Sequence, residues 1–105
     1  MEMANYIYSI LKNQLSIIWS WGFNSPIALT NGLQFKVEGF IFKGWVKITY
    51  NSGKDLFDIF LLNYQMEVVK KIDGIYFDQL VMVIDSEVEM VNDYENRVKQ
   101  EYSLI

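Results

Sequence analysis

The chain of 105 residues contains no histidine and no cysteine, and its single arginine is Arg97. Without these residue types one chain cannot assemble a Ser-His-Asp or Cys-His nucleophile pair, and zinc loses its usual ligands. The length suits one domain, 1–105, and a hydrophobic fraction of 51% with 16% aromatic residues predicts a folded core. The net charge of −4 argues against nucleic-acid binding, for which basic clusters supply most of the affinity.

The amino terminus carries no basic region, and polar residues from Ser9 to Ser16 interrupt the segment that follows it. We therefore expect neither a signal peptide nor a membrane span. The lack of cysteine excludes disulfides, which fits a reducing compartment. Together these features predict a cytoplasmic protein that does not contact the membrane.

Helical spacing marks the segment 4–21. Apolar residues recur there every three or four positions, at Ile7, Ile10, Leu11, Leu15, Ile18 and Trp21. The spacing predicts one helix that ends at Gly22, before the sequence Asn24-Ser25-Pro26. Its polar face carries Ser, Asn and Gln, and Lys12 is the one charged residue between Met3 and Phe35. Such an uncharged face either packs on a second side within the monomer or forms a subunit contact.

After a loop that contains Pro26, the apolar pattern changes to a period of two, which predicts a strand over 33–38. Gly39 suggests a bend, and Lys43-Gly44 marks the turn into a second strand over 45–50. A turn over 51–54 leads into a third strand over 56–62.

The hydrophobic pattern of the second and third strands predicts their register. Placing Tyr50 opposite Asp55 sets four apolar residues on one face of the sheet, Val46, Ile48, Phe57 and Ile59. On the other face the same register pairs Lys47 with Asp58 and Trp45 with Phe60.

A fourth extended segment covers 65–72, and helical spacing returns from Ile75 to about Gln100. The apolar stripe of this second helix is Phe77, Leu80, Val81, Ile84, Val88 and Val91. The predicted fold is therefore α+β: helix, antiparallel meander of three to four strands, helix, in a single compact domain.

The order of elements resembles the double-stranded-RNA-binding domain, which is also helix, three strands, helix. That resemblance implies a lysine-rich start to the last helix that grips phosphates. The corresponding segment here, Ile75-Tyr76-Phe77-Asp78-Gln79-Leu80, contains no lysine, so RNA binding is not expected.

A second resemblance covers nearly the whole chain and involves Gly44 to Tyr50, Lys54 to Phe57 and Tyr76 to Val81. These segments look like those of short uncharacterised α+β proteins of anaerobic gut bacteria and their mobile elements. The shared features are hydrophobic patterns and turn residues, so the resemblance implies a fold and no activity.

The acidic residues do not predict a catalytic or metal site. Asp85, Glu89 and Asp93 share one face of the last helix, where a solvated surface is a simpler explanation than a cation site. Asp55 and Asp58 should point to opposite faces of their strand and cannot converge. We assign no catalytic, cofactor-binding or metal-binding residue and expect a non-enzymatic protein without a cofactor.

The strongest candidate site is the sheet face opposite the predicted core. An apolar centre with a charged rim is typical of protein contacts. The candidate interaction surface consists of Trp45, Lys47, Asp58, Phe60, Leu62 and Val69.

This surface predicts a protein-interaction module that self-associates, for instance as a homodimer, or docks a protein partner. One alternative is that the first helix or the Pro26 loop covers the same face within the monomer. Another alternative is nucleic-acid binding through the lysine-bearing strands, which the net charge of −4 disfavours.

Overall fold

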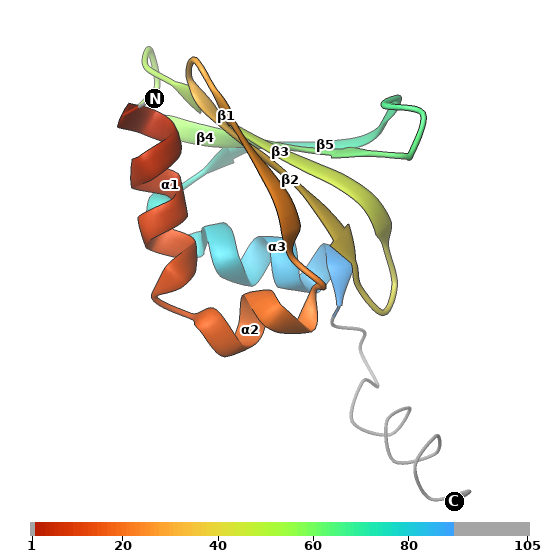
Figure 1. The fold of residues 1–105 in the computed structure, drawn as a ribbon. Coiled ribbons are helices and arrows are strands. Elements are labelled where there is room, and N and C mark those ends of the chain that lie inside the picture. The colour runs from red at the N-terminus through yellow and green to blue at the C-terminus, as the bar shows by residue number, and fades with distance from the viewer. Residues whose placement is uncertain (1, 90–105) are drawn as a thin grey trace, which may run out of the picture.

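The computed structural model describes residues 2–89, which form one five-stranded antiparallel sheet with helices packed against it (Figure 1). Helices α1 (Glu2–Lys12) and α2 (Leu15–Ser20) precede the sheet. The 3₁₀ turn η1 (Phe77–Gln79) and helix α3 (Leu80–Val88) follow it. The strands are β1 (Asn24–Leu29), β2 (Gly32–Glu38), β3 (Lys43–Asn51), β4 (Leu56–Leu62) and β5 (Val68–Ile75).

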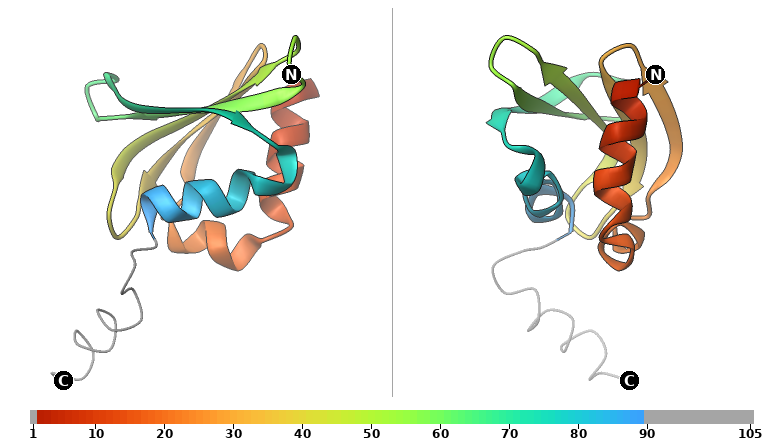
Figure 2. Two further views of the ribbon diagram at one scale, coloured as in Figure 1. Left: turned by 180° about the vertical axis from the view of Figure 1, so that it is seen from behind. Right: turned by 90° about the vertical axis from the view of Figure 1, so that its left-hand side faces the viewer.

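The strands are hydrogen-bonded in chain order, β1-β2-β3-β4-β5, and the helices of the described part lie on one side of the curved sheet (Figure 2). This arrangement confirms the predicted α+β class, with a helix before and a helix after an antiparallel meander. The sheet has five strands. The sequence indicated three to four, because the residues of β1 were expected to form a loop.

Strand β1 escaped prediction because its sequence, Asn24-Ser25-Pro26-Ile27-Ala28-Leu29, lacks an alternating apolar pattern. Every residue of β1 except Leu29 is exposed, since the strand lies at the edge of the sheet. An edge strand tolerates Pro26, which has no N–H to donate. The pairing with β2 also shifts between Asn24 and Ile27, where Ser25 has a positive φ of 55°.

The predicted single helix over 4–21 is two helices, separated at Asn13 and Gln14. The backbone N–H groups of Ile17 and Ile18 both donate to the carbonyl of Gln14, so α2 starts a new helical turn there. The outer sides of α1 and α2 are exposed to solvent. This corrects the alternative that the uncharged face of the first helix packs on a second side within the monomer. Breaking the helix lets Ile7 and Leu11 of α1 and Ile18 of α2 all become buried.

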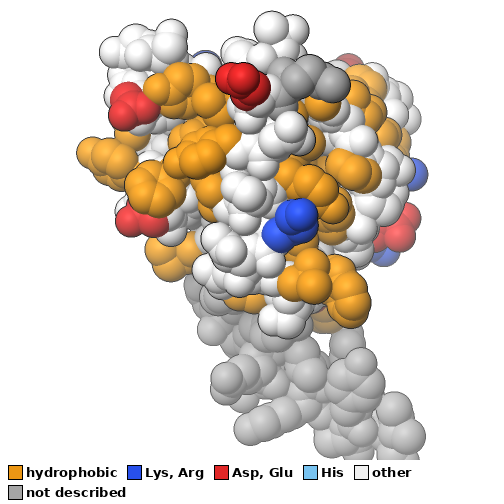
Figure 3. Space-filling model, turned by 60° about the vertical axis from the view of Figure 1, so that its left-hand side comes forward, with side chains coloured by type: hydrophobic (Ala, Val, Ile, Leu, Met, Phe, Trp, Pro, Cys, Tyr) orange, Lys and Arg blue, Asp and Glu red, His pale blue; other side chains and the backbone are white. Residues whose placement is uncertain are grey.

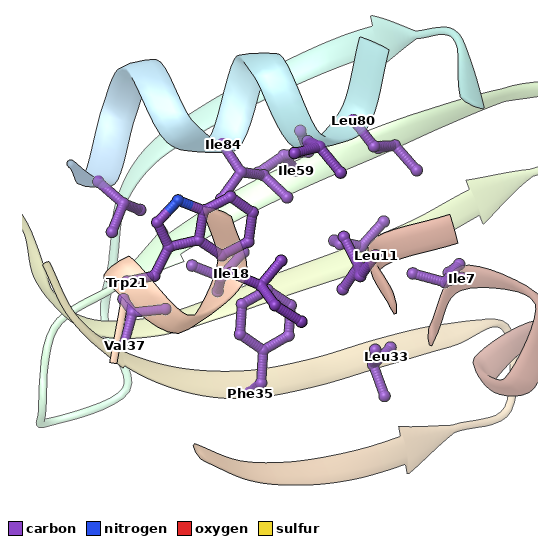
Figure 4. Packing of buried hydrophobic residues seen from close by; sticks show 14 of the residues in the cluster. Ile7, Leu11, Ile18, Trp21, Leu33, Phe35, Val37, Ile59, Leu80 and Ile84 are labelled. Atoms are coloured by element: carbon purple, nitrogen blue, oxygen red, sulfur yellow. The ribbon is translucent and has the colours of Figure 1, made fainter. Parts of the chain in front are cut away.

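The core lies between the helices and the inner face of the sheet (Figure 4). Trp21 is fully buried at the end of α2 and stacks on Phe35 of β2, with ring centroids 6.3 Å apart. Its indole nitrogen donates a hydrogen bond of 2.9 Å to Asp85 of α3. Trp21 thus joins the two helical segments and the sheet at one point.

The last helix starts later than expected, because β5 continues to Ile75 and η1 precedes α3. Leu80, Val81, Ile84 and Val88 are buried as predicted, whereas Phe77 is 54% exposed. The proposed continuation to Gln100, with Val91 and Asp93, lies outside the described residues. At its end α3 is fixed by the β2–β3 loop, where the Ile41 and Phe42 N–H groups donate to the carbonyl of Val88.

The predicted register of β3 and β4 is wrong by two residues, although the predicted faces are right. Tyr50 lies opposite Phe57 and not Asp55, and Ile48 lies opposite Ile59. A shift by two residues keeps every side chain on its own face, since the side-chain period of a strand is two. The difference arises because the turn between β3 and β4 covers 52–55, one residue later than the expected 51–54, so that Asn51 and Leu56 form the pair next to the turn.

Candidate functional site

The helices leave the opposite side of the sheet uncovered, and we call this side the outer sheet face. Its side chains alternate along β2, β3 and β4 with the buried core residues. The central positions of the outer sheet face are Gln34, Lys36, Trp45, Lys47, Thr49, Asp58, Phe60, Leu62 and Lys71. Neither α1 nor the segment around Pro26 covers it, because α1 packs on the other side and Pro26 is in the edge strand β1.

Phe60 lies at the centre of the outer sheet face, between two lysines. Lys47 of β3 and Lys71 of β5 are its direct cross-strand neighbours. Their ammonium nitrogens lie 4.8 Å and 5.4 Å from the centroid of the Phe60 ring. A ring attracts cations to its faces, and the lysine stems shield it from water. Phe60 is therefore half-buried without any helix above it.

Trp45 and Leu62 form the neighbouring row of the outer sheet face. They are paired across β3 and β4, and Lys36 of β2 is opposite Trp45 on the other side. Leu62 is only 5% exposed, so it supports this face from within and offers little surface of its own.

The structure changes the place of the predicted Val69. The register between β4 and β5 shifts at this point, so that Val68 and not Val69 lies opposite Leu62. Val69 has no cross-strand partner in β4 and is 55% exposed beside the β4–β5 loop. The apolar centre therefore extends through Val68.

Asp58 does not pair with Lys47, contrary to the sequence-based expectation. It lies opposite Thr49, and its carboxylate accepts a hydrogen bond from the backbone N–H of Gly74 at 3.3 Å. Lys47 instead lies over the Phe60 ring. Among the central positions of the outer sheet face, Lys36, Lys47 and Lys71 stand against the acid Asp58, while the exposed Glu38 follows Lys36 on the same side at the end of β2, opposite Lys43. The centre of this face is therefore locally basic on an acidic protein.

Both edge strands of the sheet carry features that disfavour pairing with an added strand. Edge strand β1 contains Pro26, and edge strand β5 carries Lys70 and Lys71 and two register shifts. Proline, lysine and bulges are the features that protect sheet edges from pairing. Any partner of this sheet is therefore expected to use its face.

Two of the acids considered as cation ligands, Asp85 and Glu89, have structural partners, and Asp93 lies outside the described residues. Asp85 accepts from the Trp21 indole, and Glu89 accepts from the backbone N–H of Phe40 at 2.6 Å. Within residues 2–89, no group of three or more acidic side chains is arranged to hold a metal ion.

A second feature is a hollow of about 520 Å³ between α1, the β3–β4 turn and η1, which we call the α1 pocket. Its lining consists of Met3, Tyr6, Tyr50, Lys54, Asp55, Phe57, Tyr76 and Phe77. Figure 3, in which the α1 side comes forward, shows hydrophobic side chains over much of this surface and few charged ones. No pattern in the sequence predicts the pocket, because its walls come from segments far apart in the chain.

Tyr50 and Asp55 form the polar part of the α1 pocket. The Tyr50 hydroxyl donates a hydrogen bond to the Asp55 carboxylate across the β3–β4 turn. This hydrogen bond, together with partial desolvation and the charge of Asp55, raises the pKa of Tyr50 above its ordinary value of 10.0. The protonated hydroxyl is favoured because a tyrosinate would lose the bond and face a carboxylate.

The Asp55→Asn substitution is accordingly expected to lower the pKa of Tyr50 toward its ordinary value. An alkaline titration followed by the NMR chemical shift of the Tyr50 Cζ carbon measures this directly. Asp58→Asn is the matched control, because Asp58 bonds Gly74 and is expected to leave the Tyr50 titration unchanged. Equal titrations in the Asp55→Asn variant and the wild type would contradict the assigned hydrogen bond.

The described residues therefore define a small α+β domain with helices on one side of a five-stranded meander. No protein-family model, no curated protein and no solved structure matches the chain. Among the helices of residues 2–89, none has the length and apolar character needed to cross a membrane.

Proposed function

We propose that this protein is a non-enzymatic interaction module that binds an acidic surface of a partner protein through its outer sheet face. The observation that supports the proposal is the row of Lys47, Phe60 and Lys71, which combines an aromatic centre with two cations on the uncovered side of the sheet. Charged rims of this kind select partners of opposite charge and speed their encounter. A carboxylate of the partner would meet the ammonium groups while apolar side chains pack beside Trp45.

A protein is a better candidate than nucleic acid because lysine ammonium groups already lie over the rings of Phe60 and Tyr64. Lys47 and Lys71 lie over Phe60, and Lys36 lies 5.1 Å from the centroid of the Tyr64 ring. Single-stranded nucleic acid binds by stacking its bases on open ring faces, which these contacts obstruct. Three lysines are also few against the net charge of −4.

A different partner is favoured over a symmetric homodimer by the same charges. A two-fold dimer brings the same patch of both copies together. Lys36, Lys47 and Lys71 of one copy would then face those of the other around Phe60, where Asp58 is the one acid among the central positions. Such like-charge contacts oppose association.

The experiment is a comparison of two charge-reversed baits in a native lysate. Lys47→Glu with Lys71→Glu alters the outer sheet face, whereas Lys12→Glu with Lys54→Glu produces the same change in net charge away from it. The face variant is expected to retain its partner about tenfold less than the control, equivalent to about 1.4 kcal/mol of binding free energy. Thermal unfolding of both baits checks that they are folded.

Three results would overturn the proposal. One is equal retention of every protein by the two variants after nuclease treatment. Another is binding of single-stranded oligothymidylate that the face variant loses and that falls steeply with salt, which would assign the surface to nucleic acid. The third is a dimer of the wild type, measured by sedimentation, that the face variant loses, which would assign the surface to self-association.

A further inference from the structure

We propose that the α1 pocket binds a small organic cation, an amine carried on an apolar body. This site is separate from the outer sheet face, because α1 and η1 lie on the helical side of the sheet (Figure 2). Its volume of about 520 Å³ lies within the range of about 300–1,000 Å³ that is typical of small-molecule sites.

The floor of the α1 pocket is an ordered group of rings. Phe57 is 3% exposed, and its ring is stacked with Tyr6 at a centroid distance of 6.4 Å and tilted against Tyr50 at 5.3 Å. These two ring contacts hold Tyr6, Tyr50 and Phe57 in place without a ligand.

The rim of the pocket is aromatic as well, and it is open to solvent. Tyr76 and Phe77 are 60% and 54% exposed, although Phe77 lies in the apolar stripe that the sequence predicted to be buried. Adjacent exposed rings are costly for a monomer unless they serve a contact. Aromatic walls on several sides favour a ligand with a positive charge, since ring faces attract cations.

The charged residues around the pocket also favour a cationic ligand. Asp55 is in its lining, with its carboxylate held by the Tyr50 hydroxyl. An adjoining hollow shares Met3, Tyr6 and Tyr50 and adds Glu2, and a third hollow shares Phe77 and adds Asp78. Lys54 is the one basic residue in the linings of these three hollows, against three acids.

Lys54 gives the proposal a specific signature. Lys54 directly precedes Asp55 in the exposed β3–β4 turn, and both residues line the pocket. The Lys54 ammonium group would therefore repel a cationic ligand or compete with it for the Asp55 carboxylate. Removing the lysine charge should therefore strengthen binding of the cation, an effect that a purely hydrophobic pocket would not show.

The test uses three probes with the same aromatic body and different charge: benzyltrimethylammonium, benzyl alcohol and phenylacetate. Each is titrated into the full chain while backbone amide shifts are recorded by NMR. The cation is expected to bind with a Kd near ~1 mM, which corresponds to a binding free energy of about −4 kcal/mol. Its binding should shift the amide signals around Tyr50, Phe57 and Phe77. Benzyl alcohol should bind about fivefold more weakly and phenylacetate more weakly still, because only the cation gains from rings and carboxylate.

Three variants extend the test. Asp55→Asn and Phe77→Ala should each weaken binding of the cation several-fold, and Lys54→Gln should strengthen it. Lys12→Gln is the matched control, because it removes the same charge from a lysine that lies over Tyr8 and outside the pocket lining. The double variant Lys47→Glu with Lys71→Glu should bind the cation as the wild type does, so failure of this site and failure of the outer sheet face are separate results.

Three outcomes would overturn the proposal. The first is a lack of saturation by benzyltrimethylammonium up to ~20 mM, equivalent to binding weaker than about −2.3 kcal/mol. The second is binding of phenylacetate as tight as that of the cation. The third is a set of shifted amides that lies away from Tyr50, Phe57 and Phe77.

Discussion

Replacing Trp21 by alanine is expected to lower the free energy of unfolding by about 3–5 kcal/mol, as is typical for the loss of a large buried aromatic side chain. Trp21 is fully buried, stacks on Phe35 and donates its indole N–H to Asp85. A domain of this size has a total stability of about 5–15 kcal/mol, so the variant should lose a substantial part of it. Urea denaturation followed by circular dichroism measures the change.

Trp21→Phe keeps a six-membered aromatic ring at this position and removes the five-membered ring with its N–H. The donor to Asp85 is lost and the carboxylate loses its partner, a loss expected to cost about 1–3 kcal/mol. Combining Trp21→Phe with Asp85→Ala should cost less than the sum of the two single changes, because both remove the same bond. Additive losses would show that the bond does not contribute, and a loss below about 1 kcal/mol for Trp21→Ala would contradict the buried position.

Gly39→Ala is the second change with a large expected effect, because the last helix ends against this glycine. A Cβ atom at Gly39 would lie 2.3 Å from Val88 Cγ1 and 2.4 Å from the Val88 carbonyl oxygen. That oxygen accepts hydrogen bonds of 2.9 Å from the Ile41 N–H and 3.2 Å from the Phe42 N–H. The added methyl group would force the end of α3 away from the β2–β3 loop, at an expected cost of about 1–3 kcal/mol.

The effect of Gly39→Ala should be local as well as global. Hydrogen exchange of the Ile41 and Phe42 amides is expected to accelerate, because their shared acceptor moves. Gly53→Ala is the matched control, since the nearest atom to its added Cβ would be Asn51 Oδ1 at 3.4 Å in an exposed turn. The control should change stability by less than about 0.5 kcal/mol. Equal stability of the two variants would show that the close approach of Gly39 and Val88 is not a constraint.

Basic and acidic residues that are separated along the chain also lie on different sides of the folded domain. Lysines concentrated in the strands provide Lys36, Lys47 and Lys71 on the outer sheet face, while Asp85 and Glu87 belong to α3 on the opposite side. Glu87 pairs with Lys70 at 2.8 Å and ties α3 to β5. The outer sheet face therefore keeps a local positive charge that the net charge of −4 conceals.

The candidate site was predictable only in part. The period of two placed Trp45, Lys47, Asp58 and Phe60 on one side of the sheet, and a register error of two residues left that assignment intact. The partners across the strands were not predictable, because Lys47 opposite Phe60 and Thr49 opposite Asp58 depend on where the turn closes. The β4–β5 register shift that replaces Val69 by Val68 has no sign in the sequence pattern.

The sequence by itself determined the features that depend on neighbours along the chain. Helical and alternating spacing predicted α1, α3 and strands β2 to β4, and the absence of histidine and cysteine excluded the corresponding chemistry. Local periodicity carries this information because a side chain points to one face of its own element.

Only the tertiary structure decided which face is covered, where the long first helix breaks and that β1 is a strand. Exposed β1 is held by backbone pairing with β2 and needs no apolar pattern of its own. The α1 pocket exists because Tyr6, Tyr50 and Phe77 meet from three distant segments. Such contacts depend on how elements pack against one another, and that packing leaves no period in the sequence.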